Sequence, residues 1–156
     1  MELPHLDEGG AARMVDVSTK AASVRTATAS GVLRTTEAVI ELLTTGTLPK
    51  GDALATARIA GIMGAKRTPD LIPLCHPIVL SGVAVELHPE RDGVRISATV
   101  RTTDRTGVEM EALTAVAVAG LALHDMVKAV DPAAVLDQVR VERKDGGKTG
   151  TWTRPE

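Results

Sequence analysis

One long run of small apolar residues restricts the folds open to this 156-residue chain more than any other feature. The pattern from Thr106 to Ala129 predicts a single helix, and its middle, Ala115 to Leu123, is small and apolar on every side. A helix of this kind is buried around its whole circumference. Because a sheet covers only one side of a helix, something other than a sheet must cover the rest.

The remaining pattern predicts four strands and two more helices. Turn residues around Asp92-Gly93 separate two alternating segments, which we expect to form an antiparallel hairpin. The predicted strands are 24–33, 79–87, 94–101 and 135–144, and the predicted helices are 35–43 and 52–66. The order strand, two helices, two strands, helix, strand predicts an α+β fold, a ferredoxin-like antiparallel sheet with helices packed on one face.

Composition narrows the core and the class of ligand. The chain has no Phe, no Tyr and one Trp, so Val, Leu, Ile, Ala and Met must build the core. Such residues bury little area each, and contact with a partner chain would add stability. The net charge of −2 does not favour nucleic acid as a partner, and a phosphate ligand would need a local cationic cluster.

Location is expected from what the sequence lacks. A single cysteine excludes a disulfide within the chain and fits a reducing compartment. The first residues do not follow the pattern of a signal peptide, and the longest apolar run, Leu113 to Leu123, is too short to span a bilayer. We therefore expect a cytoplasmic protein with no membrane partner.

Both ends of the predicted long helix carry charged residues. Asp125 and Lys128 share a face, either as a surface ion pair or as an acid–base pair at the edge of a desolvated region. Thr106 and Glu109 have the spacing of a capping box, which gives Glu109 a structural role. Glu111 has no such explanation.

The connector Pro73 to Pro77 holds Cys75 and His76 between two prolines. Adjacent side chains do not easily act as nucleophile and base to each other, so a cysteine protease is disfavoured. The histidines and the one cysteine show no zinc-ligand spacing, so no metal site is expected. The connector either packs a buried thiol or presents His76 and its backbone to a ligand.

Basic residues lie at the junctions between predicted elements, where they are either solvated or form a phosphate pocket. They are Lys50, Lys66, Arg67, Lys144 and Lys148. The segment Gly146 to Thr149 is not a P-loop, because Glu142 stands where a glycine is required and no helix follows.

Seven segments together resemble the family of molybdenum cofactor biosynthesis protein C, the cyclic pyranopterin monophosphate synthases. They span almost the whole chain, from Met14 to about Gly150: 14–18, 50–52, 55–61, 65–68, 70–77, 106–114 and 125–128. The resemblance implies a lyase that converts 3′,8-cyclo-7,8-dihydroguanosine 5′-triphosphate to cyclic pyranopterin monophosphate and pyrophosphate. It implies a hexamer built as a trimer of dimers, with sites shared between chains and no cofactor.

The same resemblance assigns the site residues. Asp125 and Lys128 correspond to the catalytic pair. The substrate-binding positions are Leu74, Cys75, His76, Met110, Glu111, Lys50, Glu109, Lys144, Lys66 and Lys148. Residues 13–150 would form one catalytic domain, between a flexible arm at 1–12 and a tail at 151–156. There are two rival classes. A nucleotide-binding regulatory module needs the basic pocket but not the pair of Asp125 and Lys128, and a structural oligomerisation domain needs neither the pocket nor the pair.

Overall fold

The structure, a computed structural model, describes residues 3–156. The strands are β1 (Ser23–Arg34), β2 (Leu80–Glu90), β3 (Gly93–Asp104), β4 (Val135–Asp145) and β5 (Trp152–Thr153). The helices are α1 (Glu37–Thr45), α2 (Ala53–Lys66), α3 (Thr68–Leu71) and α4 (Glu109–Val127).

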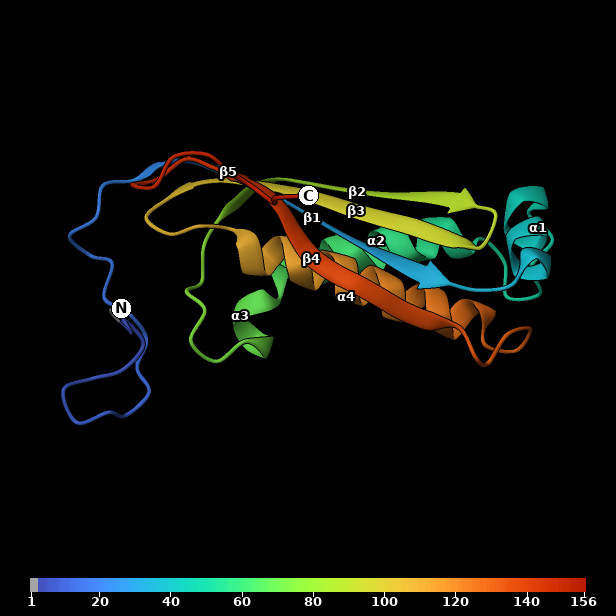
Figure 1. The fold of residues 1–156 in the computed structure, drawn as a ribbon, viewed down its shortest axis with the longest axis horizontal. Coiled ribbons are helices and arrows are strands. Elements are labelled where there is room, and N and C mark those ends of the chain that lie inside the picture. The colour runs from blue at the N-terminus through green and yellow to red at the C-terminus, as the bar shows by residue number, and fades with distance from the viewer. Residues whose placement is uncertain (1–2) are drawn as a thin grey trace.

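The strands form one antiparallel sheet in the order β2-β3-β1-β4-β5, with α2 and α4 on the same face (Figure 1). Strand β3 pairs with both β1 and β2, and β1 pairs with both β3 and β4. Each long helix therefore connects two parallel strands that have a third strand between them: α2 lies between β1 and β2 in the chain, and α4 between β3 and β4. This is the split β-α-β arrangement of a ferredoxin-like fold. The predicted fold class is confirmed.

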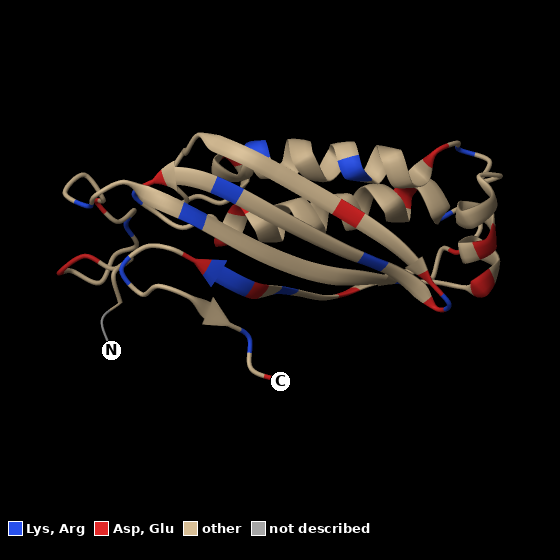
Figure 2. Ribbon diagram, turned by 90° about the horizontal axis from the view of Figure 1, so that it is seen from above, with Lys and Arg blue, Asp and Glu red and all other residues tan. Residues whose placement is uncertain are grey.

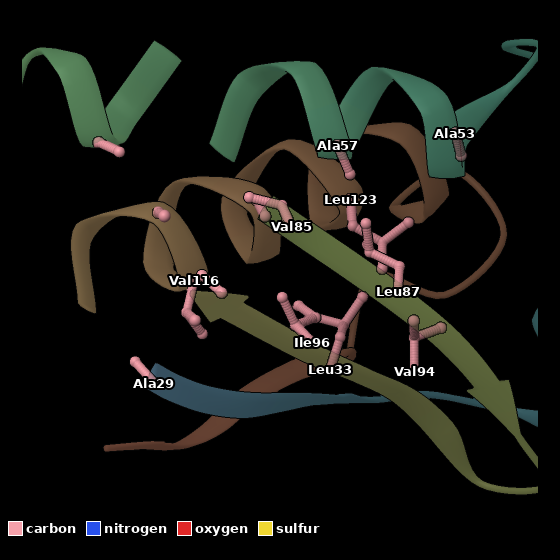
Figure 3. Close-up of a cluster of buried hydrophobic side chains, with 14 of the residues drawn as sticks. Ala29, Leu33, Ala53, Ala57, Val85, Leu87, Val94, Ile96, Val116 and Leu123 are labelled. Atoms are coloured by element: carbon pink, nitrogen blue, oxygen red, sulfur yellow. The ribbon is translucent and has the colours of Figure 1, made fainter. Parts of the chain in front are cut away.

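A core without aromatic rings fills the space between the sheet and the helices (Figure 3). Leu33, Ile96 and Leu123 are fully buried at its centre, as the composition predicted. The one Trp, Trp152, lies outside the core on β5, where its ring is within 5.7 Å of the Arg154 guanidinium.

Glycines allow α2 and α4 to pack closely. A Cβ at Gly61 would come within 2.9 Å of the Ala115 carbonyl oxygen, and one at Gly64 within 2.8 Å of Val118. Part of the circumference of α4 stays uncovered in the single chain, since Leu121 is 64% exposed. The sheet and α2 together therefore cover most of α4 but not all of it.

The start of α4 differs from the prediction. The helix begins at Glu109, its cap residue is Val108, and no side chain caps it. The predicted capping box of Thr106 and Glu109 is therefore wrong, because the Glu109 carboxylate pairs with Lys144 instead.

Two short elements were missed, and one turn is tighter than predicted. β5 pairs with the end of β4 inside what was predicted to be a tail, and α3 is a single turn after α2. Strands β2 and β3 extend until Glu90 pairs with Gly93, so that Pro89 lies within β2, an edge strand. An edge position tolerates proline because the missing N–H faces away from the ladder.

Two expectations about the chain's ends and its most apolar segment have only partial tests. Residues 1–2 of the predicted flexible arm lie outside the described residues, and 3–12 are exposed with one bridge between Leu6 and Ala12. By length and composition alone, α4 could cross a membrane. The helix is longer than the apolar run from Leu113 to Leu123, which alone is too short to span a bilayer. It packs against the sheet and α2, as a core helix does.

Candidate active site

The residues expected at the site gather at opposite ends of α4. We call Lys50, Asp125 and Lys128 the C-terminal cluster. The N-terminal cluster is Cys75, His76, Glu109, Met110, Glu111 and Lys144. Glu111 and Asp125 are fourteen positions apart, which places them about 21 Å apart along the helix axis. A single chain therefore does not bring all the predicted residues together.

The C-terminal cluster places one carboxylate between two ammonium groups. Lys128 Nζ lies 2.7 Å from Asp125 Oδ1, which confirms that the two residues share a face. Lys50 Nζ donates to the Asp125 backbone carbonyl at 3.0 Å and lies 3.4 Å from Oδ2. Lys50 reaches this position because it lies just before α2, which runs in the opposite direction to α4.

The two lysines set the protonation state of Asp125. The hydrogen bond and charge of Lys128, and then those of Lys50, hold the pKa of Asp125 below its ordinary value. Asp125 is therefore ionised at neutral pH, when it can accept a proton but has none to donate. The carboxylate is exposed to solvent, so a ligand can reach it.

The N-terminal cluster contains a buried carboxyl group. Glu111 is 1% exposed, Cys75 Sγ lies 3.4 Å from its Oε1, and its Oε2 has no hydrogen-bond partner among residues 3–156. Burial is the main cause that raises the pKa of Glu111, and the Glu109 charge adds to it. Burial and the adjacent Glu111 raise the pKa of Cys75 to about 12, so its thiol is protonated and is not a nucleophile at neutral pH.

A cavity of about 340 Å³ lies beside the first turn of α4. Its lining includes Lys144 of β4 and Lys148, which follows β4. Lys144 pairs with Glu109 at 3.1 Å, and Lys148 lines the wall. Figure 2 shows that Lys and Arg are scattered along the strands and at element ends, with no continuous basic stripe on the face viewed. An anion in this cavity would therefore bind to a local group of cations and not to an extended basic surface.

Two more cations line this cavity that the sequence analysis did not single out, Lys20 and Arg25. Arg25 lies beside the turn at Gly146 and Gly147, both of which have positive φ. A Cβ at Gly146 would come within 2.1 Å of the Val24 carbonyl oxygen, so the turn approaches β1 only as glycine. The sequence pattern did not identify Lys20 and Arg25, because the lysines that line the cavity with them, Lys144 and Lys148, lie more than a hundred positions away in the chain.

The other expected residues are less engaged. Leu74 is half-buried, Met110 is 38% exposed, and Lys66 is exposed in the last turn of α2. His76 Nε2 makes a hydrogen bond with the Val15 carbonyl. Within residues 3–156, no group of three His, Cys, Asp or Glu side chains has a metal-binding arrangement.

Comparison with known proteins extends the resemblance found in the sequence. The family model described as "MoaC family" matches residues 14–147, which include every residue of both clusters. The chain belongs to the MoaC family. Cyclic pyranopterin monophosphate synthase from Streptomyces coelicolor is 68% identical over 152 residues, covering 97% of this chain and 89% of that protein.

Two further MoaC relatives carry the same name. Cyclic pyranopterin monophosphate synthase 2 from Mycobacterium tuberculosis is 63% identical over 153 residues, covering 98% of this chain and 92% of the relative. The Corynebacterium efficiens synthase is 57% identical over 152 residues, with 97% and 98% covered. The likeness therefore spans both clusters and the elements that position them.

Proposed function

We propose that this chain is a cyclic pyranopterin monophosphate synthase of molybdenum cofactor biosynthesis. It would convert 3′,8-cyclo-7,8-dihydroguanosine 5′-triphosphate to cyclic pyranopterin monophosphate and pyrophosphate, as a lyase without a cofactor. The observation that carries the proposal is the C-terminal cluster, in which Lys50 and Lys128 both hold the ionised Asp125 in a MoaC-family chain.

The chemistry of the reaction matches the two clusters. Rearranging a purine ring requires proton transfers, and the ionised Asp125 has the free lone pair that a proton acceptor needs, beside two lysines that can donate. Closing a cyclic phosphate and expelling pyrophosphate requires cations near the phosphates. Lys144 and Lys148, with Lys20 and Arg25, would supply them in the cavity beside α4.

A shared site would unite the two clusters. Because they lie about 21 Å apart on one helix, a compact ligand contacts both only if the N-terminal cluster of a second chain faces the C-terminal cluster of the first. Apolar side chains on the outer faces of α2 and α4 support such a contact: Ile59 is 59%, Met63 49% and Leu121 64% exposed. We propose a dimer as the unit that contains a complete site, three of which form a hexamer.

The surroundings of the enzyme are part of the same proposal. A single free cysteine, a net charge of −2 and a small-molecule substrate support a cytoplasmic enzyme that binds neither nucleic acid nor membrane.

Turnover is the direct test of this function. The purified chain, given the cyclic triphosphate, should release pyrophosphate and form the pterin product in equal amounts. A nucleotide-binding module would bind the triphosphate without releasing pyrophosphate, and a structural domain would do neither. Either result with a folded protein would exclude the proposed activity.

A further inference from the structure

The segment before β1 contacts His76, a residue expected at the active site. The site described above gives this segment no role. Met14–Ser18, which we call the strap, has no regular secondary structure. It lies across from His76–Ile78 and Asp104–Thr106, and the three segments line an open depression of about 500 Å³.

The strap determines how the His76 ring can act. A backbone carbonyl only accepts hydrogen bonds, so the contact with Val15 requires a proton on His76 Nε2. In the neutral ring, Nδ1 then carries the lone pair, and it makes no hydrogen bond within residues 3–156. His76 therefore offers an acceptor nitrogen at a fixed orientation.

Two contacts order the chain that follows Val15. Asp16 Oδ1 accepts from the Ser18 backbone N–H at 2.9 Å, which forms a side-chain-mediated turn directly after Val15. Further along, Arg105 Nε donates to the Lys20 carbonyl at 3.0 Å and ties the chain two residues after the strap to the connector before α4. Hydrogen bonds from Ser18 keep the pKa of Asp16 below its ordinary value, so its carboxylate is ionised and accepts at neutral pH.

We propose that the strap is a positioning element for the reaction, in which the turn at Asp16 holds the Val15 carbonyl on His76 Nε2 so that Nδ1 is the acceptor offered to the substrate. Asp16 and Val15 would thus act through His76. The inference rests on the proposed function for its consequence in catalysis, and on the geometry alone for the state of the ring.

Variants of Asp16 test the strap in the full chain. Asp16→Ala removes the acceptor of the turn, whereas Asp16→Asn keeps an oxygen that Ser18 N–H can reach. The matched control is Asp7→Ala, because Asp7 Oδ1 accepts from the Gly9 and Ala11 N–H groups in a similar turn far from His76. All three proteins should keep the parent's melting temperature closely, since both turns are exposed.

The readouts are the ¹⁵N resonances of the His76 ring and the kinetics. In the parent, Asp7→Ala and Asp16→Asn, the ring should show a single Nε2–H tautomer. In Asp16→Ala it should show averaging of the two tautomers, and kcat should fall by about 10-fold to 100-fold with a smaller change in KM.

Three results would overturn the proposal. They are an unchanged His76 signal in Asp16→Ala, an unchanged kcat in that variant, and an equal loss in Asp16→Asn, which would implicate the charge and not the turn. If the parent itself had no turnover, the proposed function would fail, whereas the comparison of His76 signals between Asp16→Ala and Asp7→Ala would still decide the state of the ring.

Discussion

At the scale of single residues, Asp125 and Lys128 show what sequence spacing can predict. Their separation of three on a helix sufficed to place them on one face, and they form an ion pair at 2.7 Å. The Lys50 contact with Asp125 and the Glu109 contact with Lys144 join distant parts of the chain, and no local pattern encodes such pairs. The capping box failed for this reason, since a distant lysine competes for the same carboxylate.

Substitutions at the C-terminal cluster should remove turnover without unfolding the chain. Asp125→Asn keeps the shape but not the charge, and Lys128→Ala removes the partner; each should lower kcat by roughly 10²-fold or more, because proton transfer is lost. Both side chains are exposed, so circular dichroism and thermal melting should match the parent. Arg91→Ala, on an exposed ion pair with Glu37 away from both clusters, is the control. Activity within a few-fold of the parent in either variant would exclude these catalytic roles.

Glu111 makes the stability of the chain depend on pH. Because burial raises its pKa in the folded state, the stability that comes from the protonated form is present at low pH and is lost as pH rises above the ordinary carboxyl range, through the raised value. Glu111→Gln removes this loss, so its gain in unfolding free energy over the parent should grow from pH 5 to pH 8. Urea unfolding at several pH values measures it.

Glu41→Gln makes the same change at an exposed position of α1 and is the control. A constant difference between Glu111→Gln and the parent across this range would mean that Glu111 finds a compensating partner in solution.

At the scale of elements, periodicity predicted every long strand and helix, but the ends and the shortest elements depend on contacts. β5 has two residues and exists because it pairs with Arg143 and Lys144 of β4. The register of β4 against β1 also shifts between Ser30 and Val32, where Gln138 adopts a φ of 54°. The position of such a bulge depends on the packing of both strands, so the sequence of one strand does not specify it.

The close packing of α2 on α4 gives a prediction about stability. Gly61→Ala should destabilise the fold by about 1–3 kcal/mol through overpacking, despite the better helix propensity of alanine, because the Ala115 carbonyl cannot move away easily. Gly82→Ala places its Cβ no closer than 3.9 Å to Arg101 and should be nearly neutral. Thermal or urea unfolding would distinguish the two, and a stabilised Gly61→Ala would show that the helices can separate at little cost.

At the scale of the whole molecule, the two clusters are halves of a proposed site that one chain cannot close. The small apolar residues on every side of α4 predicted that something besides the sheet must cover it, and the structure adds the exposed apolar side chains that a second chain would cover. The family resemblance supplied the assembly, because nothing in the residue pattern of one chain fixes how many copies associate.

Mixing two inactive variants tests the shared site. Glu111→Ala and Asp125→Asn, each inactive alone, should regain activity when their subunits exchange, because some mixed dimers carry one site with both residues intact. The positive control for exchange is a mixture of tagged and untagged parent chains, followed by affinity capture. Confirmed exchange without recovered activity would mean that each chain builds its own site.

The placement of Trp152 makes its fluorescence a reporter of the proposed site. With no Tyr and no Phe, all of the chain's near-ultraviolet fluorescence comes from one indole, and that indole is on a strand paired with Lys144. The emission therefore does not report on the packing of the aliphatic core, but it responds to changes beside the cavity lined by Lys144 and Lys148. Addition of pyrophosphate can be followed in the unlabelled parent by the change in emission, whereas the collapse of the core must be followed by backbone circular dichroism.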